Sequence, residues 1–520
     1  MRGSVNASIQ GEGCQYTDPA GRVAVLWSGR IAFGSALSDE ETGRRILQLY
    51  AEHGLQFPKH LPGRFALALH DSDHQRTLLA RDAAGLEPLY YASVSDGRLI
   101  FGSTICDVLP ELGLVTLNPA ALLDYLAFFW SLDDKTFFQG VHLLPQGTVY
   151  CNGRTERYSE FEPAPEERSV AEWSEAILEA LTNATNAVRS EAMGCHLSGG
   201  IDSSLLTVLL GQDRAVPPPA FVAAFPEYPD HDEARFGRIV ARRLGVELVE
   251  IAPKPSELPE VFSDMIRTIE EPKCHPPVFP RFLLETTAAG RGLRTMVGGR
   301  GADELFTGYE WHRDAALARH REVRTVFNAE QRARLLRPEF LAEVDYGPEA
   351  AYEQVLEDCP SSTPLEKILA LDFRTLLANW LVLDYKISRR FGIQPAAPFL
   401  DRRVIELALR IPAELKRLNG EPKGLLKSAV VHLLPAEVLD RRKVGFRTPF
   451  GEMLRAGLEN FVRESLHEDS SAFWSVFNPE GVSQLVKDHF RGDSNQGWQI
   501  WAVLCIREWF RQFLDGKEGP

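Results

Sequence analysis

The chain has 520 residues, of which 44% are hydrophobic and 25% charged, and this composition excludes a disordered, collagen-like or coiled-coil protein for most of its length. Its 57 Lys and Arg residues against 72 Asp and Glu residues give a formal net charge of −15, which does not favour non-specific binding to nucleic acid or to an anionic membrane. A chain of this length is expected to hold about two to four domains, and we expect neither nucleic acid nor a membrane among its partners.

The sequence shows no sign of targeting or cross-linking segments. No stretch approaches the ~18 uninterrupted apolar residues of a membrane-spanning helix, and the first residues run into polar ones without the apolar region of a signal peptide. The 7 cysteines are scattered and form no CxxC pair, so neither a disulfide framework nor a zinc site is indicated. We therefore expect a reducing, cytoplasmic setting.

The N-terminal part of the chain is predicted to be a layered antiparallel sheet. Short apolar runs recur between residues 22 and 102, and turn residues such as Pro62-Gly63 separate them, as in antiparallel strands joined by tight turns. One helix is expected to interrupt the strands near residues 40–53, where apolar residues have helical spacing.

From about residue 193 the pattern changes. Apolar runs that suit buried strands alternate with helix-like segments, and these runs lie at 193–197, 221–225, 246–251 and 295–297. This alternation predicts a doubly wound parallel sheet with helices on both faces. The last stretch, from about residue 366, is predicted to be mainly helical. An exposed segment rich in proline and glutamate at 162–169 predicts a boundary between residues 1–165 and 166–520.

The strongest local signal is the segment Leu197-Ser198-Gly199-Gly200-Ile201-Asp202-Ser203-Ser204, which lies between an apolar run and a helix-like run. Two adjacent glycines let the backbone turn tightly, and the N-terminus of the following helix offers unpaired N–H groups to an anion. The serine hydroxyls can donate to phosphate oxygens, whereas Asp202 would repel phosphate and is expected to hold Mg²⁺. The pattern predicts a phosphate-binding loop; the alternative is an ordinary strand–turn–helix corner.

A second signal, Gly298-Gly299-Arg300-Gly301-Ala302-Asp303-Glu304, also follows an apolar run. In a doubly wound sheet both loops lie at the carboxyl ends of strands, so Asp202 and Asp303 are expected to face one Mg²⁺–pyrophosphate unit. The alternative for Asp303 and Glu304 is a helix N-terminus with an acidic first turn. Two interpretations of Arg300 stay open: a bidentate grip on a substrate carboxylate, or a salt bridge to Glu304 or another acid.

The third signal is the basic segment at 441–450, in which Lys443 precedes a glycine turn. A cation placed there can neutralise charge that develops on a phosphate or an oxyanion. The alternative is a solvated basic surface.

Taken in this order, the three motifs resemble those of the asparagine synthetase family of ATP-pyrophosphatases, and further matches lie at 397–403 and 423–427. The resemblance implies that the chain adenylates a carboxylate with ATP and Mg²⁺ and releases pyrophosphate. An amine or ammonia then attacks the acyl-adenylate to give an amide and AMP. Lys443 matches the family lysine that stabilises the transition states of both steps.

Carried over residue by residue, the resemblance implies catalytic roles for Lys443, Asp202 and Asp303, with Asp202 and Asp303 as the metal ligands. The nucleotide-binding residues that it implies are Leu197, Ser198, Gly199, Gly200, Asp202, Ser203, Ser204, Val297, Gly298, Gly299 and Lys423. Arg300 is counted among the catalytic candidates because it stands where the family has a glutamate. Arginine stays protonated and cannot be a general base, so ordinary asparagine synthesis is not expected.

The N-terminal half resembles the family's class II glutaminase domain in a degenerate form. The segment at 81–90 matches the family, but Arg2 stands where the family has its cysteine nucleophile, and Arg30 stands where it has a carboxylate. We therefore expect no glutaminase activity. The expected fold class is α/β plus α: a degenerate, Ntn-like antiparallel layered domain, then a doubly wound parallel-sheet nucleotide-binding domain with a helical C-terminal part.

The leading hypothesis is an ATP-dependent amide-forming ligase of natural-product or peptide tailoring, which joins a small-molecule or peptide carboxylate to an amine or ammonia without glutamine hydrolysis. One alternative is a lasso-peptide macrolactam cyclase, whose partners would include a precursor peptide and a leader-processing protein. Others are a β-lactam-synthetase-like enzyme and a nucleotide-binding pseudo-enzyme. The general base stays open among Tyr309, Glu310, Asp384 and the adenylate itself.

Overall fold

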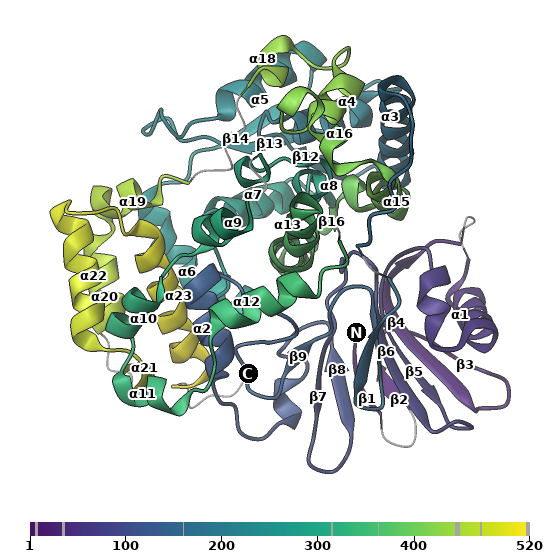
Figure 1. Cartoon of the computed structure of the whole chain (residues 1–520), viewed down its shortest axis with the longest axis horizontal. Helices are drawn as coiled ribbons and strands as arrows, with labels where there is room; N and C mark the ends of the chain where they lie inside the picture. The colour runs from purple at the N-terminus through teal and green to yellow at the C-terminus, as the bar shows by residue number, and fades with distance from the viewer. Residues whose placement is uncertain are drawn as a thin grey trace.

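The computed structural model of the chain describes residues 1–5, 9–33, 37–159, 161–313, 316–361, 363–441, 448–467 and 471–515. Two antiparallel sheets belong to the N-terminal part, and a parallel sheet with most of the helices makes up the rest (Figure 1). No helix in these ranges is long and apolar enough to cross a membrane.

The two N-terminal sheets are built from short strands. One sheet has the order β2 (Ile9–Glu12), β1 (Arg2–Val5), β8 (Leu99–Gly102), β7 (Tyr90–Ser93) and β9 (His142–Leu143). The other has the order β11 (Arg154–Arg157), β10 (Thr148–Cys151), β6 (Arg76–Arg81), β5 (Gly63–Asp71), β4 (Val23–Ile31) and β3 (Cys14–Thr17). Neighbouring strands in both sheets are antiparallel, which confirms the predicted antiparallel N-terminal part.

Successive side chains of β5 serve two different cores. Leu67 and Leu69 belong to the apolar cluster beneath helix α1 (Asp39–His53), whereas Ala66 and Ala68 belong to the cluster between the two sheets. This alternation is the period of two that a strand buried on both faces requires. The expected helix is therefore present and covers the outer face of the six-stranded sheet (Figure 1).

The third sheet is wholly parallel. Its order is β14 (Leu248–Ile251), β13 (Ala220–Ala223), β12 (Met193–His196), β15 (Thr295–Val297) and β16 (Gln394–Ala396). The chain builds outward from β12 to β14 and then returns to place β15 on the other side of β12. This reversal makes a switch point between β12 and β15, where α/β sheets leave a crevice at the carboxyl ends of the strands. The predicted parallel sheet is confirmed.

Strand β16 was not expected from the sequence, because Pro395 interrupts its strand-like pattern. Proline cannot donate a ladder hydrogen bond, and it is tolerated on edge strands. β16 is the edge of the sheet and pairs only with β15 among the described strands.

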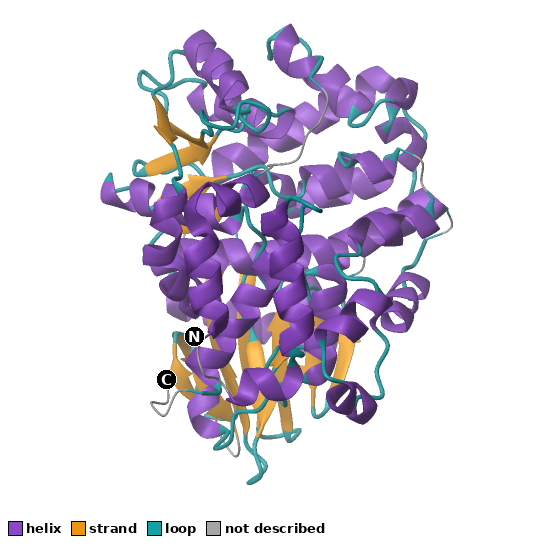
Figure 2. Cartoon of the chain, turned by 90° about the vertical axis from the view of Figure 1, so that its left-hand side faces the viewer, coloured by secondary structure: helices purple, strands orange, loops and turns teal. Residues whose placement is uncertain are grey.

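The described chain contains many helices besides α1, and some of them lie between the parallel sheet and the antiparallel sheets (Figure 2). In chain order they are α2 (Pro119–Phe128), α3 (Val170–Ala187), α4 (Ile201–Gly211), α5 (Ala234–Leu244), α6 (Leu258–Ile269), α7 (Val278–Gly290), α8 (Ala302–Phe306), α9 (Leu317–Arg324), α10 (Ala329–Leu335), α11 (Pro338–Glu343), α12 (Pro348–Glu357), α13 (Pro364–Asp372), α14 (Ala378–Arg390), α15 (Arg402–Arg410), α16 (Ala413–Lys416), α17 (Gly424–Val430), α18 (Ala436–Leu439), α19 (Phe450–Met453), α20 (Glu459–His467), α21 (Ser471–Val476), α22 (Pro479–Arg491) and α23 (Gly497–Phe513). Apart from β16, the described chain beyond residue 366 consists of helices and turns, as the sequence predicts.

One hydrophobic cluster joins the two halves of the chain and extends from Ala84 in the N-terminal half to Phe510 in α23. Polar contacts reinforce the junction: Glu270, which follows α6, accepts the backbone N–H groups of Ile105 and Cys106 at 2.9 Å each. The same carboxylate pairs with Lys386 of α14 at 2.7 Å. Residues 161–169 between the halves form no helix or strand, and a division of the chain at residue 165 stays a prediction.

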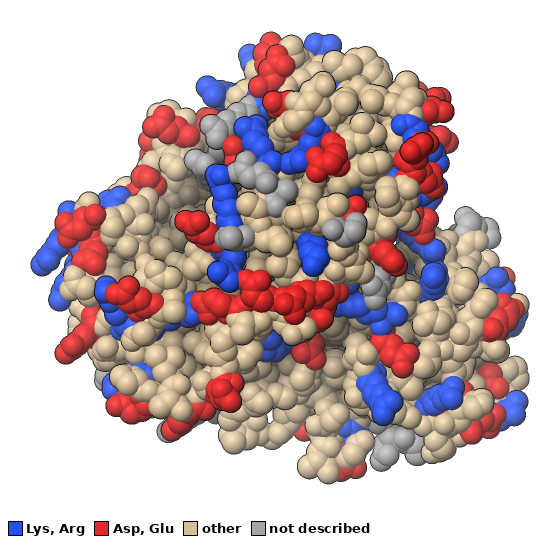
Figure 3. Space-filling model, viewed as in Figure 1, with Lys and Arg blue, Asp and Glu red and all other residues tan. Residues whose placement is uncertain are grey.

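The surface carries charges of both signs. A band of acidic side chains crosses the middle of the face seen in Figure 3, at the position of α12 in Figure 1. This band agrees with the net charge of −15.

Candidate functional site

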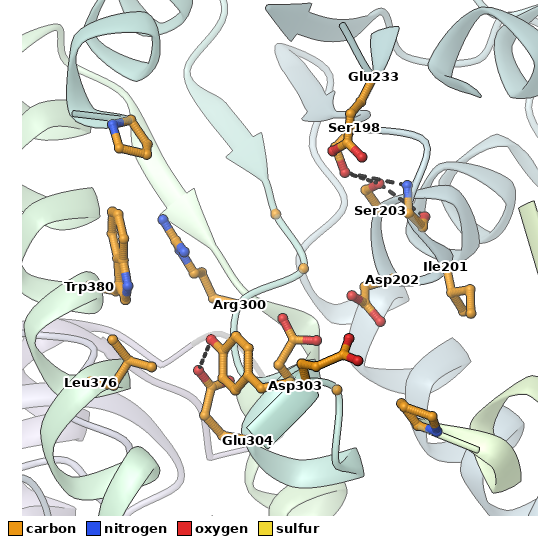
Figure 4. Close-up of a pocket in the computed structure, with 18 of the residues that line it drawn as sticks. Ser198, Ile201, Asp202, Ser203, Glu233, Arg300, Asp303, Glu304, Leu376 and Trp380 are labelled. Atoms are coloured by element: carbon orange, nitrogen blue, oxygen red, sulfur yellow. Dashed lines mark hydrogen bonds between the residues drawn. The ribbon is translucent and has the colours of Figure 1, made fainter. Parts of the chain in front are cut away.

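A cavity of about 760 Å³ opens at the carboxyl ends of β12 and β15, at the switch point of the parallel sheet. Its wall includes the loops that follow both strands and, from the N-terminal half, the end of α2. Figure 4 shows Ser198 and Ser203 on one side of this space, Trp380 on the other, and Asp202 and Asp303 between them. The two glycine-containing loops singled out in the sequence therefore meet in one cavity.

The loop after β12 is shaped by its two glycines. Gly199 has a φ of +73°, and a Cβ atom on it would lie 2.3 Å from Cβ of Phe236, so only glycine fits. Gly200 then precedes α4, whose first turn receives no side-chain cap, so its backbone N–H groups are available to an anion. The hydroxyls of Ser198 and Ser203 lie 3.2 Å apart beside these groups. This geometry suits a phosphate-binding loop, and that role stays a prediction.

The loop after β15 backs directly onto the first loop. A Cβ atom on Gly299 would lie 2.9 Å from Cβ of Asp202, so the absent side chain lets the two loops touch. Gly301 has a φ of +90°, and a Cβ atom there would lie 2.4 Å from Cδ2 of Leu400. Gly301 is the residue before α8, the helix that carries Asp303 in the cavity wall.

Lys423 joins the two aspartates. Its Nζ lies 2.7 Å and 2.6 Å from the carboxylate oxygens of Asp202 and 2.5 Å from Oδ1 of Asp303. Burial alone would lower the pKa of Lys423, but the two carboxylates raise it above its usual value, so the ammonium stays charged. Lys423 has a left-handed backbone with a φ of +56°, which is uncommon for a residue with a side chain. Gly308 completes this cradle, because a Cβ atom on it would lie 1.8 Å from Oδ1 of Asp303.

This cluster fits a divalent cation that is bound together with phosphate. Mg²⁺ in nucleotide sites takes one or two carboxylates, with phosphate oxygens and water completing its shell. Asp202 and Asp303 reach one common point, where the ammonium of Lys423 supplies the positive charge. No cluster of three or more His, Cys, Asp or Glu side chains able to hold a metal occurs among the described residues. A cation held by two carboxylates and a substrate phosphate is therefore the arrangement that these residues favour.

Arg300 pairs with Asp384. Its Nε lies 2.7 Å from Oδ2 and its Nη2 3.3 Å from Oδ1 of that carboxylate, while the guanidinium carbon lies 4.3 Å from the ring centre of Trp380. Of the two interpretations of Arg300, the structure shows the salt bridge, and its partner is Asp384 rather than Glu304. Since Nε and Nη2 are both used here, the edge they form is not available for a bidentate grip on a substrate.

Two of the expected proton acceptors, Asp384 and Tyr309, already have hydrogen-bond partners. Burial would raise the pKa of Asp384, but Arg300 lowers it below its usual value, so Asp384 is an ionised salt-bridge partner. Tyr309 donates its hydroxyl to Oε1 of Glu304 at 2.7 Å. Burial and the neighbouring Asp303 raise the pKa of Glu304 to about 7. Glu304 is thus a candidate acid or base that was not singled out from the sequence, although the adjacent acidic pair was its visible signal.

The basic segment reaches the first loop at its start. Arg441 donates from Nη1 to the backbone carbonyl oxygen of Ser198 at 3.2 Å, and it pairs with Glu233. Residues 442–447, with Lys443 among them, lie outside the described residues. The catalytic role expected of Lys443 therefore stays a prediction.

Most of the predicted site residues line the cavity. They are Leu197, Ser198, Gly200, Asp202, Ser203, Gly298, Gly299, Arg300, Asp303 and Lys423, together with Tyr309 and Glu310. Gly199, Ser204 and Val297 are not part of this wall. The hydroxyl of Ser204 is buried and makes no hydrogen bond, because this side chain of α4 turns into the core. Ser204 therefore does not present its hydroxyl to an anion in the cavity.

The far end of the cavity is aromatic, which was not predicted from the sequence. The ring of His275 stacks on Trp380 with 4.7 Å between centroids and 18° between planes. Phe129, at the end of α2, lies 4.9 Å from His275 and 5.6 Å from Trp498, at the start of α23. Burial, with Arg324, lowers the pKa of His275 to about 3, so its imidazole is neutral. These residues come from segments far apart in the sequence and share no local motif.

Comparison with known proteins covers both halves of the chain. The family described as Asparagine synthase matches residues 176–511, and the Glutamine amidotransferase domain matches residues 29–161. Asparagine synthetase [glutamine-hydrolyzing] 1 of Bacillus subtilis (strain 168) is 24% identical over 539 residues, which cover 94% of this chain and 84% of that protein. Asparagine synthetase B [glutamine-hydrolyzing] of Escherichia coli (strain K12) is 26% identical over 424 residues, which cover 78% of this chain and 64% of that protein.

A solved structure of glutamine phosphoribosylpyrophosphate amidotransferase from B. subtilis is also similar in part. It matches 45% of this chain and 47% of its own chain at 13% identity, with a TM-score of 0.19. That score is too low to show a common arrangement.

Proposed function

The chain belongs to the asparagine synthase family of ATP-dependent amide ligases, and from this premise we propose that it adenylates a carboxylate and passes the acyl group to an amine or ammonia without hydrolysing glutamine. Its relatives indicate an enzyme that forms C–N bonds. The observation that carries the proposal is the meeting of Asp202, Asp303 and Lys423 between two glycine-containing loops at the switch point.

The proposed reaction has two steps, and its atoms balance. An oxygen of the substrate carboxylate attacks the α-phosphorus of ATP, and the bond from that phosphorus to its bridging oxygen breaks, so pyrophosphate leaves. The amine nitrogen then attacks the acyl carbon, loses a proton and displaces AMP. AMP keeps the oxygen that came from the carboxylate.

Different residues of the cavity would bind the phosphates, hold the metal ion and supply positive charge. The N–H groups at the start of α4 and the hydroxyls of Ser198 and Ser203 would hold the pyrophosphate oxygens. Asp202 and Asp303 would hold Mg²⁺, which when bound neutralises charge on the departing pyrophosphate. Lys423 keeps the two carboxylates together and adds a fixed positive charge beside them. Holding both reactants in one cavity supplies a large part of the rate by proximity.

Glutamine independence is supported by the chemistry of the N-terminal cysteines. A glutaminase of this class needs a reactive thiolate, and thiolates form where the pKa of the thiol is lowered. Residues 1–165 contain Cys14, Cys106 and Cys151, and burial raises the pKa of each of these thiols. None of the three is therefore suited to be a nucleophile. The N-terminal half instead packs against the synthetase half and supplies the end of α2 to the cavity wall.

A second candidate is a macrolactam cyclase that acts on a peptide, such as the lasso-peptide type. Two apolar residues of the cavity wall, Val323 and Trp498, are 53% and 39% exposed. An exposed apolar rim suits a substrate that extends out of the cavity, as a precursor peptide would. In that case the amine belongs to the same molecule as the carboxylate, and a leader-processing protein would act with this enzyme.

The test measures pyrophosphate release with ATP, Mg²⁺ and a panel of carboxylic acids and peptides. We expect release that depends on the acid, and we expect Asp202→Ala to lower kcat/KM by about 100-fold or more, in line with loss of charge stabilisation in a water-excluded site. Glu179→Ala, at an exposed acid of α3, is the matched control and should behave like the wild type.

Two further measurements separate the alternatives. Ammonia should replace glutamine as a nitrogen donor, and glutamate release from glutamine would overturn the glutamine-independent part of the proposal. Failure to bind ATP with Mg²⁺ would overturn the ligase proposal itself. ATP binding without pyrophosphate release from any acid would favour a nucleotide-binding pseudo-enzyme.

A further inference from the structure

Arg324 contacts two tryptophan rings near the aromatic end of the cavity. It is the last residue of α9, and its guanidinium carbon lies 4.3 Å from the ring centre of Trp130 and 4.9 Å from that of Trp311. Trp311 in turn stacks on Tyr309 with 4.4 Å between centroids and 17° between planes. The two rings contact the guanidinium carbon, whereas the N–H donors lie in the plane of the guanidinium, where arginine binds planar anions.

No carboxylate pairs with Arg324 among the described residues, and its Nε is buried without a hydrogen-bond partner. Four other cations of the cavity wall have acidic partners: Arg281 pairs with Glu285, Arg300 with Asp384, Lys423 with Asp202 and Asp303, and Arg441 with Glu233. A buried donor without a partner costs free energy. The arrangement therefore suits a ligand that brings the missing acceptor.

Asp372 is the carboxylate whose charge acts most strongly on Arg324, and it is already occupied by other donors. Asp372 accepts hydrogen bonds from Nε1 of Trp311 at 2.8 Å and pairs with the rings of His312 at 2.9 Å and His320 at 3.1 Å. These contacts fix Trp311, and so the ring that covers Arg324, but they leave the guanidinium edge without a counter-ion in contact. Asp372 thus positions the Arg324 site and does not fill it.

Apolar surface lies in the same part of the cavity. The cluster of Phe129, His275, Trp380 and Trp498 lines it, and burial lowers the pKa of His275 so that its ring is neutral. Burying an apolar body against these rings is favourable. A small polar amino acid would leave them uncovered.

We propose that the acyl substrate carries two acidic groups on an apolar or aromatic body, and that Arg324 holds the acidic group that is not adenylated. This inference rests on the proposed function, because it assumes that another carboxylate of the same molecule reacts at Asp202 and Asp303. Among the described residues Arg324 makes no ion pair with Asp303, which instead contacts Lys423, so we assign a different acidic group to each place. The substrate class is therefore an apolar dicarboxylate or a peptide with two acidic groups.

The first experiment uses benzoate as the probe and benzamide as its uncharged counterpart, with binding followed by calorimetry. The expected result is that benzoate binds the wild type and that benzamide binds at least 10-fold more weakly. Arg324→Leu should weaken benzoate binding at least 10-fold, since a charge-assisted bidentate contact is lost. Arg321→Leu is the matched control on the same helix, because Arg321 pairs with Glu353 at the surface, and it should bind benzoate like the wild type.

The inference is overturned if benzoate does not bind, if benzamide binds equally well, or if Arg324→Leu binds benzoate as the wild type does. Should Arg324→Leu fail to fold, a wild-type crystal soaked in benzoate decides the matter by whether the carboxylate lies on the edge of Arg324. In the pyrophosphate assay, apolar diacids should outperform their monoacid counterparts, and Arg324→Leu should remove that preference. Binding of ATP with Mg²⁺ to the wild type and the same variants is measured separately. If the wild type does not bind ATP with Mg²⁺, the ligase proposal is wrong. If it binds ATP with Mg²⁺ but not benzoate, only this inference is wrong.

Discussion

Replacing Lys423 with methionine tests the electrostatic centre of the site. Lys423 Nζ is the only cation in contact with both Asp202 and Asp303 among the described residues, and its side chain is 5% exposed. Lys423→Met keeps the length of the side chain but removes the ammonium that contacts both carboxylates. Removing one partner of a buried ion pair costs about 3–5 kcal/mol, so we expect the free energy of unfolding to fall by that amount in a buffer that contains EDTA.

Mg²⁺ should restore part of this loss. In Lys423→Met the two carboxylates become a site that a divalent cation can enter, and a ligand at about 100 times its Kd stabilises a folded protein by about 2.7 kcal/mol. Urea unfolding followed by tryptophan fluorescence, with EDTA and with Mg²⁺, measures both effects. Lys427→Met is the control on the following helix, because Lys427 lies 3.8 Å from Glu421 and is 26% exposed, and it should cost less than about 1 kcal/mol. Equal losses of the free energy of unfolding in Lys423→Met and Lys427→Met would contradict this prediction. Equal stabilisation of both variants by Mg²⁺ would contradict it as well.

Three further changes have defined outcomes. Gly308→Ala places a Cβ atom 1.8 Å from Oδ1 of Asp303, so we expect a loss of about 1–3 kcal/mol of stability and a larger loss of pyrophosphate release; an active Gly308→Ala enzyme would show that Asp303 is not held in place by this contact. His275 has a pKa of about 3 in the folded protein and about 6.5 when unfolded, so the unfolded chain binds the proton first and stability falls as the pH drops below 6.5. Between pH 7 and pH 5 this loss is about 2 kcal/mol; His275→Gln should remove it from the pH profile of urea unfolding, and an unchanged profile would contradict the assignment. Glu270→Gln leaves Lys386 buried beside a neutral group and should cost about 3–5 kcal/mol, seen as a lower urea midpoint, whereas an unchanged midpoint would show that this contact does not tie the two halves together.

The sequence predicts the parts of the site that depend on local backbone requirements. Adjacent glycines at Gly199-Gly200 and Gly298-Gly299 mark positions where the two loops turn tightly or approach each other closely, and both loops follow apolar runs that become strands. Because parallel strands place their carboxyl ends at one edge, the meeting of Asp202 and Asp303 follows from the order of strands and loops along the chain.

The remaining parts depend on pairings between distant segments. The sequence around Arg300 does not predict its salt bridge with Asp384 of α14. The sequence around Lys423 does not predict its position between two aspartates. Arg324 is an ordinary helical arginine in the sequence, and only the contacts of its guanidinium with Trp130 and Trp311 make it distinctive. Strand β16 could not be predicted from the sequence for the same reason. Its Pro395 is tolerated only because the strand lies at the edge of the sheet, and that position depends on pairing with β15.

The most direct test of the central claim follows the oxygen atoms. An acid that supports pyrophosphate release is prepared with its carboxylate labelled with a heavy oxygen isotope, and the products are analysed by mass spectrometry after turnover. The expected result is that the label appears in the phosphate of AMP, because a carboxylate oxygen attacks the α-phosphorus beside Asp202 and Asp303. Unlabelled AMP, or label found in inorganic phosphate, would contradict it.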